Sequence, residues 1–377
     1  IRRHIHANPE LSFFEEETAQ FIQSKLDEIG VPYIADFAGH GIVVKIEGKN
    51  PAKKIIALRA DIDALPITEA NDISYKSTNE GVMHACGHDV HTANLLGVIK
   101  ILNELKNEFE GTVKCIFQPA EEKFPGGASL MIKEGVLKNP EPTIIIGQHV
   151  HPPMNVGNVG FAEGKYMASA DEIFMTIHGK GGHAAAPRNF IDPILMTSQI
   201  IVALQQVVSR LAPPETPTVL SFGKINSVGG YNNIIPEAVK LDGTFRTMEE
   251  DWRYEAHKHI KRIAESTAHA NGGSVDVQIN VGYPHLINQP DLTNRCRKYA
   301  KDFLGNDRVE ELPIRMGAED FAYYSHQIPG CFYRLGIKNE ALGINSGLHT
   351  PTFNIDEDAF KTGVGLMAWL AICELNN

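Results

Sequence analysis

The pattern that most constrains this fold is a regular alternation of short apolar runs with helical segments. Runs of strand length lie at residues 55–58, 113–117 and 144–146. Residues 15–29 and 89–106 instead carry apolar side chains at helical spacing, and Asp89 is the expected N-cap of the second helix. Strand–helix–strand alternation predicts an α/β fold, in which helices cover both faces of a sheet.

A different order interrupts this alternation in the middle of the chain. Strand-like runs and helical segments follow one another there as β-α-β-β-α-β, at residues 174–177, 193–211, 218–225, 238–245, 252–270 and 275–281. This is the order of the ferredoxin-like, or split βαβ, unit. We therefore predict a small domain at 169–281, inserted into a larger domain that is formed by 1–168 and 282–377.

The charge and the cysteines limit the partners and the compartment. A formal net charge of −11 argues against nucleic acid and anionic membranes as partners, because both need a basic surface. No segment is expected to reach the roughly 20 apolar residues of a membrane span. The five cysteines are odd in number and widely spaced, and most lie within apolar segments. This distribution favours a reducing compartment, so the expected location is the cytoplasm.

One short stretch concentrates metal-binding side chains. His84-Ala-Cys86-Gly-His88-Asp89-Val-His91 places one thiol, three imidazoles and a carboxylate at the start of the second helical segment. Burying so many polar groups is unfavourable unless they have a partner. Thiolate and neutral imidazole are the ligands that a borderline-soft divalent metal prefers. The stretch therefore predicts a metal site, against the alternative of surface histidines around one buried cysteine.

Further polar clusters follow the strand-like runs. They are Asp61 and Asp63, Glu121 and Glu122, His149 and His151, and, after the run 331–335 and a loop, His349. In open α/β sheets ligands bind beyond the carboxyl ends of the strands, so these side chains are expected to converge on one cleft. Adjacent residues at a strand end point in opposite directions. One carboxylate of the Glu121–Glu122 pair can therefore ligate a metal while the other faces the substrate and moves a proton.

These motifs together resemble the M20 metallopeptidase and amidohydrolase family, in its aminoacylase-like, hippurate hydrolase-like and auxin-conjugate hydrolase-like branch. They appear in the family's order over nearly the whole chain: Arg2-Arg3-His4-Ile5-His6-Ala7-Asn8-Pro9-Glu10-Leu11, Leu58-Arg-Ala-Asp61-Ile-Asp63-Ala-Leu-Pro66, His84-Ala-Cys86-Gly-His88-Asp89, Pro119-Ala-Glu121-Glu122, Gly147-Gln-His149-Val, Gly179-Lys-Gly-Gly-His183-Ala, Asn232-Asn233-Ile-Ile-Pro236, Gly317-Ala-Glu319-Asp320-Phe321 and Leu348-His349-Thr-Pro351. The resemblance implies a zinc-peptidase-like three-layer α/β/α catalytic domain, with the inserted ferredoxin-like domain as its lid.

The resemblance also implies a site for two divalent metal ions, zinc or manganese. The implied ligands are Cys86, His88, Glu122, His149 and His349. Cys86 takes the bridging place in which most of the wider family has an Asp, and Glu121 maps to the general base. The family's usual His-x-Asp after the early strand is Arg59-Ala-Asp61 here, which leaves Asp61 to orient a ligand or to bond Arg59. Three histidines map to no ligand: His84, His91 and His151.

Within the inserted domain the resemblance points to three residues. His183 matches a lid histidine that stabilises the transition-state oxyanion, which requires the lid to close over the substrate. In many relatives a partner subunit supplies this histidine, so the resemblance implies either a homodimer through the lid or action within one chain. Asn233 and Arg246 are candidates for holding the substrate's amide or carboxylate, and the Arg fork suits a carboxylate. The alternative for Arg246 is a surface position on a strand.

These assignments predict a two-metal amidohydrolase that cleaves N-acyl amino acids with acetyl, benzoyl or related acyl groups. Glu121 would take the proton of a metal-activated water, and the metals and His183 would stabilise the oxyanion. A metallo-dipeptidase or aminopeptidase with the same centre is the first alternative. A binding protein that has lost catalysis is the second, and it predicts a substituted ligand or base, whereas all of those residues are present. The acyl group and the amino acid stay open.

Overall fold

The computed structural model describes residues 1–377, which form two compact units. Unit 1 comprises Ile1–Tyr166, Leu286–Ile314 and Asp320–Asn377, and unit 2 comprises Met167–His285 and Arg315–Glu319. The predicted insert 169–281 omits the short segment Arg315–Glu319. This segment joins unit 2 through non-local hydrogen bonds, because the N–H of Ala168 reaches the carbonyl oxygens of Arg315 and Gly317 at 3.1 and 3.0 Å.

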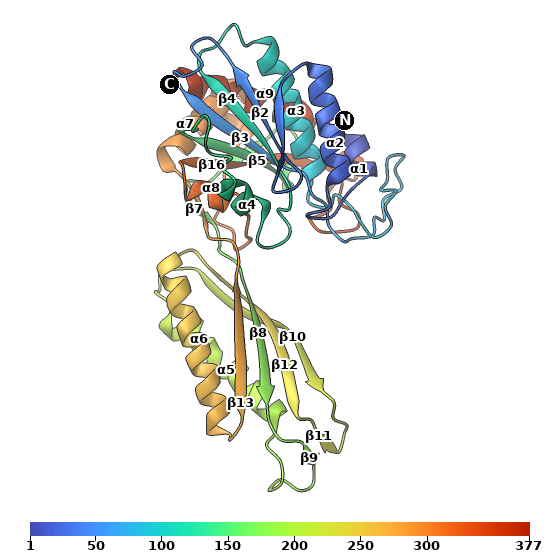
Figure 1. Ribbon diagram of the computed structural model, residues 1–377, viewed down its shortest axis with the longest axis vertical. Coiled ribbons are helices and arrows are strands. Elements are labelled where there is room, and N and C mark those ends of the chain that lie inside the picture. Colours follow the sequence, from blue (N-terminus) through green and yellow to red (C-terminus); the bar gives the residue numbers. More distant parts are fainter. The chain divides into compact units, whose positions relative to one another are not determined.

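Unit 1 is built on an eight-stranded mixed sheet of order β1-β2-β4-β3-β5-β16-β6-β15 (Figure 1). Its strands are β1 (Tyr33–Phe37), β2 (Gly41–Glu47), β3 (Ile55–Asp61), β4 (Thr112–Gln118), β5 (Ile145–Asn155), β6 (Val159–Phe161), β15 (Val309–Glu311) and β16 (Gly330–Lys338). The central strands β4, β3, β5 and β16 run parallel to one another. Their carboxyl ends therefore lie along one edge of the sheet, at which the sequence places its polar clusters.

Helices cover both faces of this sheet, which gives three layers. They are α1 (Arg2–Ala7), α2 (Glu16–Ile29), α3 (His88–Glu104), α4 (Gly127–Lys133), α7 (Pro290–Leu304), α8 (Ala322–Ser325) and α9 (Ala359–Asn376), with 3-10 turns at Asn306–Arg308 and Glu340–Leu342. Alternate strand residues, such as Leu58, Cys115 and Ile146, join one buried cluster with side chains of α2, α3, α7 and α9. On the other face α4 and α8 pack against β4 and β16, and the rings of Phe321 and Phe332 lie 4.9 Å apart.

Unit 2 is a four-stranded antiparallel sheet with two helices. Its main elements follow one another as β8 (Asp171–His178), α5 (Pro193–Gln206), β10 (Thr218–Val228), β12 (Ala238–Thr247), α6 (Glu250–Ala270) and β13 (Ser274–Val281). The sheet order is β10-β12-β8-β13, and the element order is the predicted β-α-β-β-α-β. Asp192 starts α5, because its carboxylate accepts the N–H groups of Ile194 and Leu195 at 2.8 and 3.2 Å. The two helices pack on each other and share one buried cluster with the sheet.

Two short strand pairs complete the chain. β9 (Gly182–His183) pairs with β11 (Ile234–Ile235) in unit 2, and β7 (Gly164–Met167) pairs with β14 (Leu286–Asn288). The architecture is thus the predicted α/β class, a three-layer unit together with a unit of ferredoxin-like element order.

The apolar helix of unit 2 corrects one expectation from the sequence. α5 continues as a π-helical turn, Val207–Leu211, and the resulting helix of 19 residues is long and apolar enough to cross a membrane. The expectation that no segment approaches this length is therefore wrong. Length and composition alone are weak evidence for a span, and Met196, Ile200 and Leu204 of this helix pack in the core of unit 2.

Asp89 does not cap α3, contrary to the sequence expectation. The helix begins at His88, one residue earlier, and Gly87 precedes it in the left-handed conformation, with φ of +83°. Asp89 is buried in the first turn, where its Oδ2 accepts hydrogen bonds from Arg2 Nε at 2.7 Å and His6 Nδ1 at 2.8 Å. Charge-assisted hydrogen bonds thus tie the N-terminal motif to the metal-binding stretch.

Candidate metal centre

The polar side chains that follow β3, β4 and β5 gather at one edge of unit 1. β3 ends at Asp61, which is followed by Asp63, and the loop after β4 carries Glu121 and Glu122. His149 comes from β5, and all of these residues except the partly buried Glu122 are buried. This is the edge at which open parallel sheets bind their ligands.

The structure brings the five predicted ligands together around Cys86. Its sulfur lies 3.5 Å from Nε2 of His149 and 3.4 Å from Nε2 of His349. The same nitrogen of His349 is 3.3 Å from Oε1 of Glu122. Two clusters of ligand atoms result, Cys86–His88–His149 and Cys86–Glu122–His349, and the atoms of each lie within 4.8 Å of one another. Both clusters contain Cys86, so the arrangement suits two metal ions that share its sulfur.

These donor atoms fit a bound cation, because two of them are buried without a hydrogen bond. They are Nε2 of His88 and Oε1 of Glu122. The other ring nitrogen of His88 is 3.0 Å from Oδ1 of Asp63, and a proton on it leaves a lone pair on Nε2. Nε2 itself lies 4.0 Å from an oxygen of Glu121 and from one of Glu122. Metal-binding histidines are commonly oriented in this way by a carboxylate on the other ring nitrogen.

The charges around His88 favour a cation at this point. Burial lowers the pKa of His88, but Asp61 and Asp63 together outweigh burial and raise that pKa to about 10. Burial raises the pKa of the Cys86 thiol, and the charge of Glu122 raises it further. Both groups hold their protons firmly within an acidic pocket, and a divalent cation would replace those protons.

Asp61 is bonded to Arg59 and also supports a histidine. Its Oδ2 accepts Nη1 of Arg59 at 2.6 Å, and its Oδ1 lies 2.5 Å from Nδ1 of His91. Nε2 of His91 accepts the N–H of Val150 at 2.9 Å. Both nitrogens of His91 are therefore occupied, with the proton on Nδ1. The Asp61–His88–His91 group also has metal-like spacing, but His91 has no lone pair to offer to a metal.

The other two unassigned histidines lie outside the clusters of metal-binding atoms. His84 is buried, neither of its ring nitrogens is hydrogen-bonded, and burial lowers its pKa to about 4. The ring is therefore neutral at physiological pH. His151 is partly buried on β5, two residues beyond His149.

The Glu121–Glu122 pair differs from the extended arrangement expected from the sequence. Ala120, directly before the pair, has a left-handed backbone with φ of +54°. The loop is therefore not a simple extension of β4, and both carboxylates reach the same nitrogen of His88. Both acids form a group of metal-like spacing with His88. Only Glu122 also belongs to the cluster with Cys86 and His349, whereas Glu121 lies close to Glu319 and Asp320.

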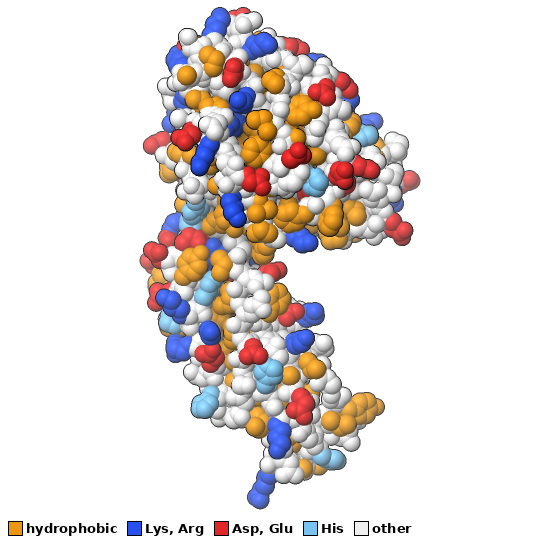
Figure 2. All heavy atoms as spheres, in the orientation of Figure 1, with side chains coloured by type: hydrophobic (Ala, Val, Ile, Leu, Met, Phe, Trp, Pro, Cys, Tyr) orange, Lys and Arg blue, Asp and Glu red, His pale blue; other side chains and the backbone are white.

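The predicted lid residues His183 and Asn233 lie side by side in unit 2. Nδ1 of His183 accepts the N–H of Ala185 at 3.1 Å, which leaves the ring proton on Nε2. The backbone carbonyl of Asn233 accepts the N–H of Ala184 at 3.0 Å, and β9 pairs with β11 next to it. Figure 2 shows apolar side chains on this end of unit 2, where Tyr231 is 76% exposed. The imidazole N–H is thus a free donor beside an exposed apolar surface.

Arg246, the second predicted substrate residue, lies on β12 and is partly buried. Its Nη1 donates to the backbone carbonyl of Met316 at 3.1 Å. One end of the guanidinium fork therefore holds the segment Arg315–Glu319, which is a role that the sequence did not suggest.

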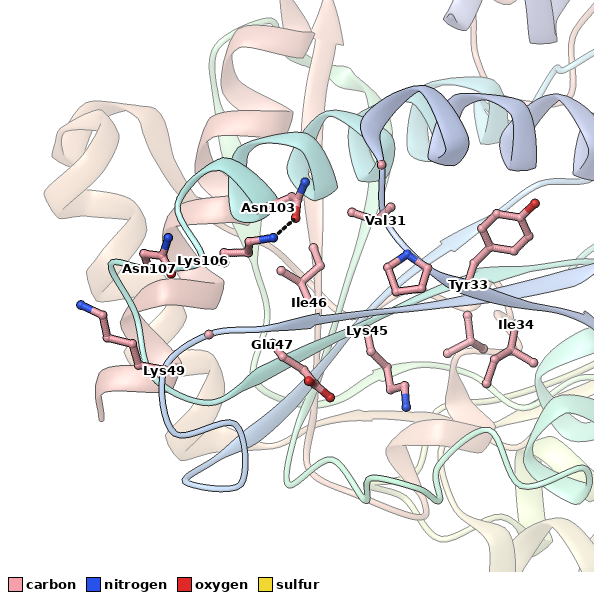
Figure 3. A pocket seen from close by; sticks show the side chains of 14 residues that line it. Val31, Tyr33, Ile34, Lys45, Ile46, Glu47, Lys49, Asn103, Lys106 and Asn107 are labelled. Atoms are coloured by element: carbon pink, nitrogen blue, oxygen red, sulfur yellow. Dashed lines mark hydrogen bonds between the residues drawn. The ribbon is translucent and has the colours of Figure 1, made fainter.

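A surface cavity elsewhere on unit 1 is separate from these residues. It has a volume of about 600 Å³, and its lining includes Val31, Pro32, Lys45 and Glu47 (Figure 3). Glu47 pairs with Thr112, the first residue of β4. The cavity therefore lies towards the amino ends of the central strands, and no predicted site residue lines it.

Comparison with known proteins gives consistent relatives. Residues 57–372 match the sequence model of Peptidase family M20/M25/M40. The chain is 38% identical over 382 residues to the N-acetylcysteine deacetylase of Bacillus subtilis (strain 168), covering 100% of this chain and 96% of that protein. It is also 38% identical over 376 residues to thermostable carboxypeptidase 2 of Saccharolobus solfataricus, covering 99% and 94%. The solved structure of the Bacillus subtilis YXEP protein, described as a dinuclear metal binding peptidase from the M20 family, has a TM-score of 0.82 and 33% identity, covering 100% and 96%.

Proposed function

Because this chain belongs to Peptidase family M20/M25/M40, a family of hydrolases, we propose that it is a two-metal amidohydrolase that cleaves N-acyl amino acids. The observation that carries the proposal is the pair of ligand clusters that share Cys86, with the unpaired Nε2 of His88 facing two glutamates. Two relatives support it: one is named as a deacetylase of an N-acyl amino acid, and another is described as binding two metal ions.

We propose that five clustered residues bind both metal ions. These are Cys86, His88, Glu122, His149 and His349. Thiolate and imidazole favour zinc, and manganese is the alternative where its availability decides occupancy. When bound, the metals supply a Lewis acid for the scissile carbonyl and lower the pKa of the attacking water.

Glu121 is assigned as the general base. Its carboxylate is buried, faces Nε2 of His88 at 4.0 Å and stays outside the cluster formed by Cys86 and His349. It takes the proton of the attacking water and returns it to the departing nitrogen. His183, whose ring proton is on Nε2, donates to the oxyanion that develops at the acyl carbon.

Asn233 and Arg246 are assigned to the amino acid part of the substrate. The carbonyl of Met316 occupies only Nη1 of Arg246, so the remaining guanidinium donors can bind a carboxylate. A peptidase that acts on unblocked peptides is the second candidate function, because a relative of 38% identity is named a carboxypeptidase. The two candidates share the metal centre and differ in the group bonded to the amino acid nitrogen.

The decisive experiment is amine release from N-acetyl, N-benzoyl and N-succinyl amino acids and from simple dipeptides. Each substrate is assayed with zinc, with manganese and with a chelator. We expect metal-dependent release from the acyl amino acids and little from the dipeptides. Release from dipeptides alone would favour the peptidase, and release that survives chelation would overturn the two-metal mechanism.

We further propose that the protein is a homodimer through unit 2 and works in the cytoplasm. The outer face of α5 exposes Ile194, Leu195 and Val202 by 45, 52 and 73%, and large apolar side chains exposed on one helix are compatible with an interface. All five cysteines are free thiols, as a reducing compartment requires. Light scattering of Val202→Glu against the unmodified chain tests the dimer, since a charge on this face should give a monomer.

A further inference from the structure

Glu15 reaches the centre of the candidate site from the start of the chain. It directly precedes α2 and is fully buried. Its Oε1 accepts the backbone N–H of Ala120 at 2.7 Å, across 105 residues of sequence. Ala120 is the residue immediately before Glu121, so this hydrogen bond holds the peptide from which the proposed base projects.

The conformation of Ala120 needs such support. Its φ of +54° is in the left-handed region, which a residue with a Cβ rarely adopts unless the surroundings impose it. Besides the bond to Glu15, the carbonyl of Ala120 accepts the N–H of Gly127 at 2.9 Å. A Cβ on Gly127 would lie 1.8 Å from the carbonyl oxygen of Pro119, so a glycine is required for this approach. Both polar groups of Ala120 are thus held from outside its own loop.

The same N-terminal segment also supports Glu122, through Asp63. Ser12 Oγ donates to Oδ2 of Asp63 at 2.7 Å, and that oxygen accepts the N–H of Glu122 at 2.9 Å. Oδ1 of Asp63 is the atom that orients His88. Residues 12–15 therefore contact both the peptide that carries the base and the carboxylate that sets a metal ligand.

We propose that Glu15 is a positioning residue for the general base, acting through the N–H of Ala120 to fix the place of the Glu121 carboxylate. The inference rests on the proposed function, in which Glu121 moves the proton. Glu15 is not part of any cluster of metal-binding atoms. Its Oε2 is buried without a hydrogen bond, which is unfavourable for stability, and such local costs are typical of functional positions.

The protonation of Glu15 is compatible with this role. Burial and the charge of Asp63 raise the pKa of Glu15 to about 7. A proton on Oε2 leaves Oε1 as an acceptor, so the bond to Ala120 is kept in either form. A glutamine, which has one amide oxygen and no charge, should therefore replace Glu15 in this contact.

The test compares Glu15→Ala and Glu15→Asp with the conservative Glu15→Gln. Glu16→Ala, a change of the exposed neighbour in α2, is the matched control. Four quantities are measured: kcat and KM on an N-acyl amino acid, bound metal, the unfolding midpoint, and hydrogen exchange of the peptic segment that contains Ala120. Hydrogen exchange reports on the contact between Glu15 and Ala120 independently of catalytic activity.

We expect Glu15→Ala and Glu15→Asp to exchange faster at Ala120 and to lose about tenfold to a hundredfold in kcat, because small misplacements of a catalytic group have effects of that size. KM and two bound metals per chain should be kept. Glu15→Gln should stay within about threefold of the unmodified chain in kcat, since its amide oxygen accepts the same N–H. The control should match the unmodified chain in every quantity.

Three outcomes overturn the proposal. One is an unchanged kcat in Glu15→Ala and Glu15→Asp despite faster exchange, and another is a loss in Glu15→Gln as large as that in Glu15→Ala. The third is loss of metal in step with kcat in Glu15→Asp, which would make Glu15 a support of the metal site; this variant keeps the test valid if Glu15→Ala does not fold. Failure of the proposed function shows separately, as full turnover in Glu121→Gln, and leaves the exchange result intact.

Discussion

Unit 1 and unit 2 each bury an aspartate against an arginine and a histidine, and the surroundings of the two aspartates differ. In unit 2, Asp171 accepts Nη2 of Arg253 at 2.5 Å and Nε2 of His257 at 2.7 Å. None of these three side chains has an unpaired buried atom. Asp61 of unit 1 has an equivalent pair of partners at 2.6 and 2.5 Å, but it lies beside polar atoms that lack partners.

The unpaired atoms next to Asp61 distinguish a site from a structural support. Nε2 of His88 lies 3.7 Å from Oδ2 of Asp61 and has no hydrogen bond, and neither has Oε1 of Glu122. A buried charge with all its hydrogen bonds made needs no ligand, whereas buried polar atoms without partners call for a missing group. A buried Asp–Arg–His set is therefore not a functional signal by itself. The signal is what the neighbouring atoms leave unsatisfied.

The largest effect is expected at Glu121, which we propose as the general base. Glu121→Gln should lower kcat by about 10²–10⁴-fold, because general acid–base catalysis contributes a factor of that order. The metal content should not change, since Glu121 belongs to neither of the two ligand clusters that contain Cys86. Steady-state kinetics and elemental analysis of the same sample measure both.

Glu122→Gln is the matched control for that change. It should lower the metal content together with turnover, because Glu122 belongs to the ligand cluster with Cys86 and His349. Loss of metal from Glu121→Gln, or full metal occupancy in Glu122→Gln, would reverse the two assignments.

The next largest effect should be a loss of stability in unit 2, where Asp171 and its partners Arg253 and His257 bind no ligand. Arg253→Met leaves a buried carboxylate without its main partner and should lower the free energy of unfolding by about 3–5 kcal/mol. The bound metal per folded chain should stay the same. Urea unfolding followed by the fluorescence of Trp252 isolates unit 2, once the other tryptophan is replaced in a Trp369→Phe background.

Arg262→Met is the control for Arg253→Met, since Arg262 is exposed on the same helix α6. It should change the free energy of unfolding by less than about 0.5 kcal/mol. Equal destabilisation by the two substitutions would show that the loss of any arginine from α6, and not the unpaired carboxylate, causes the effect.

The third prediction compares an Asp→Asn substitution in each unit. Asp63→Asn weakens the acceptor that orients His88 and should reduce metal affinity by about 10–100-fold, the usual effect of losing such a support. Asp171→Asn in unit 2 should leave metal affinity unchanged while it destabilises that unit. Competition with a coloured chelator measures both affinities. An equal loss of affinity in Asp171→Asn and Asp63→Asn would show that the effect is not specific to the aspartate that orients His88.

The local pattern of the sequence was sufficient for several elements of both units and for the edge at which the site lies. Helical spacing over 15–29 and 252–270 and the strand-like run 113–117 correspond to α2, α6 and β4. The polar residues at the strand ends could be identified because parallel strands end at one edge. Both inferences need only neighbouring residues and a general rule of sheet geometry.

The partners of the buried charges could not be read in this way. Asp89 has the sequence signature of an N-cap, yet it is bonded to Arg2, 87 residues away. Glu15 lies in an acidic helix start typical of a solvated turn, yet it is buried against Ala120. Such pairs depend on the tertiary fold, and a single sequence carries no local period that reports them.

The smallest expected effect is a pH dependence of the stability of unit 2. Burial of Glu250 raises its pKa, but His285 and Arg253 outweigh burial and lower that pKa to about 2. A carboxyl whose pKa is lower in the folded than in the unfolded chain contributes stability that is complete above its unfolded pKa near 4.5 and is lost as the pH falls towards 2. Because Glu250 is partly exposed, solvent screening limits this contribution to about 1 kcal/mol.

Urea unfolding of unit 2 between pH 6 and pH 2.5, followed by the fluorescence of Trp252, should show a smaller loss of stability in Glu250→Gln than in the unmodified chain. If the free energy of unfolding falls equally with pH in both chains, the pKa of Glu250 is not lowered by folding. Asp171 alone would then hold Arg253.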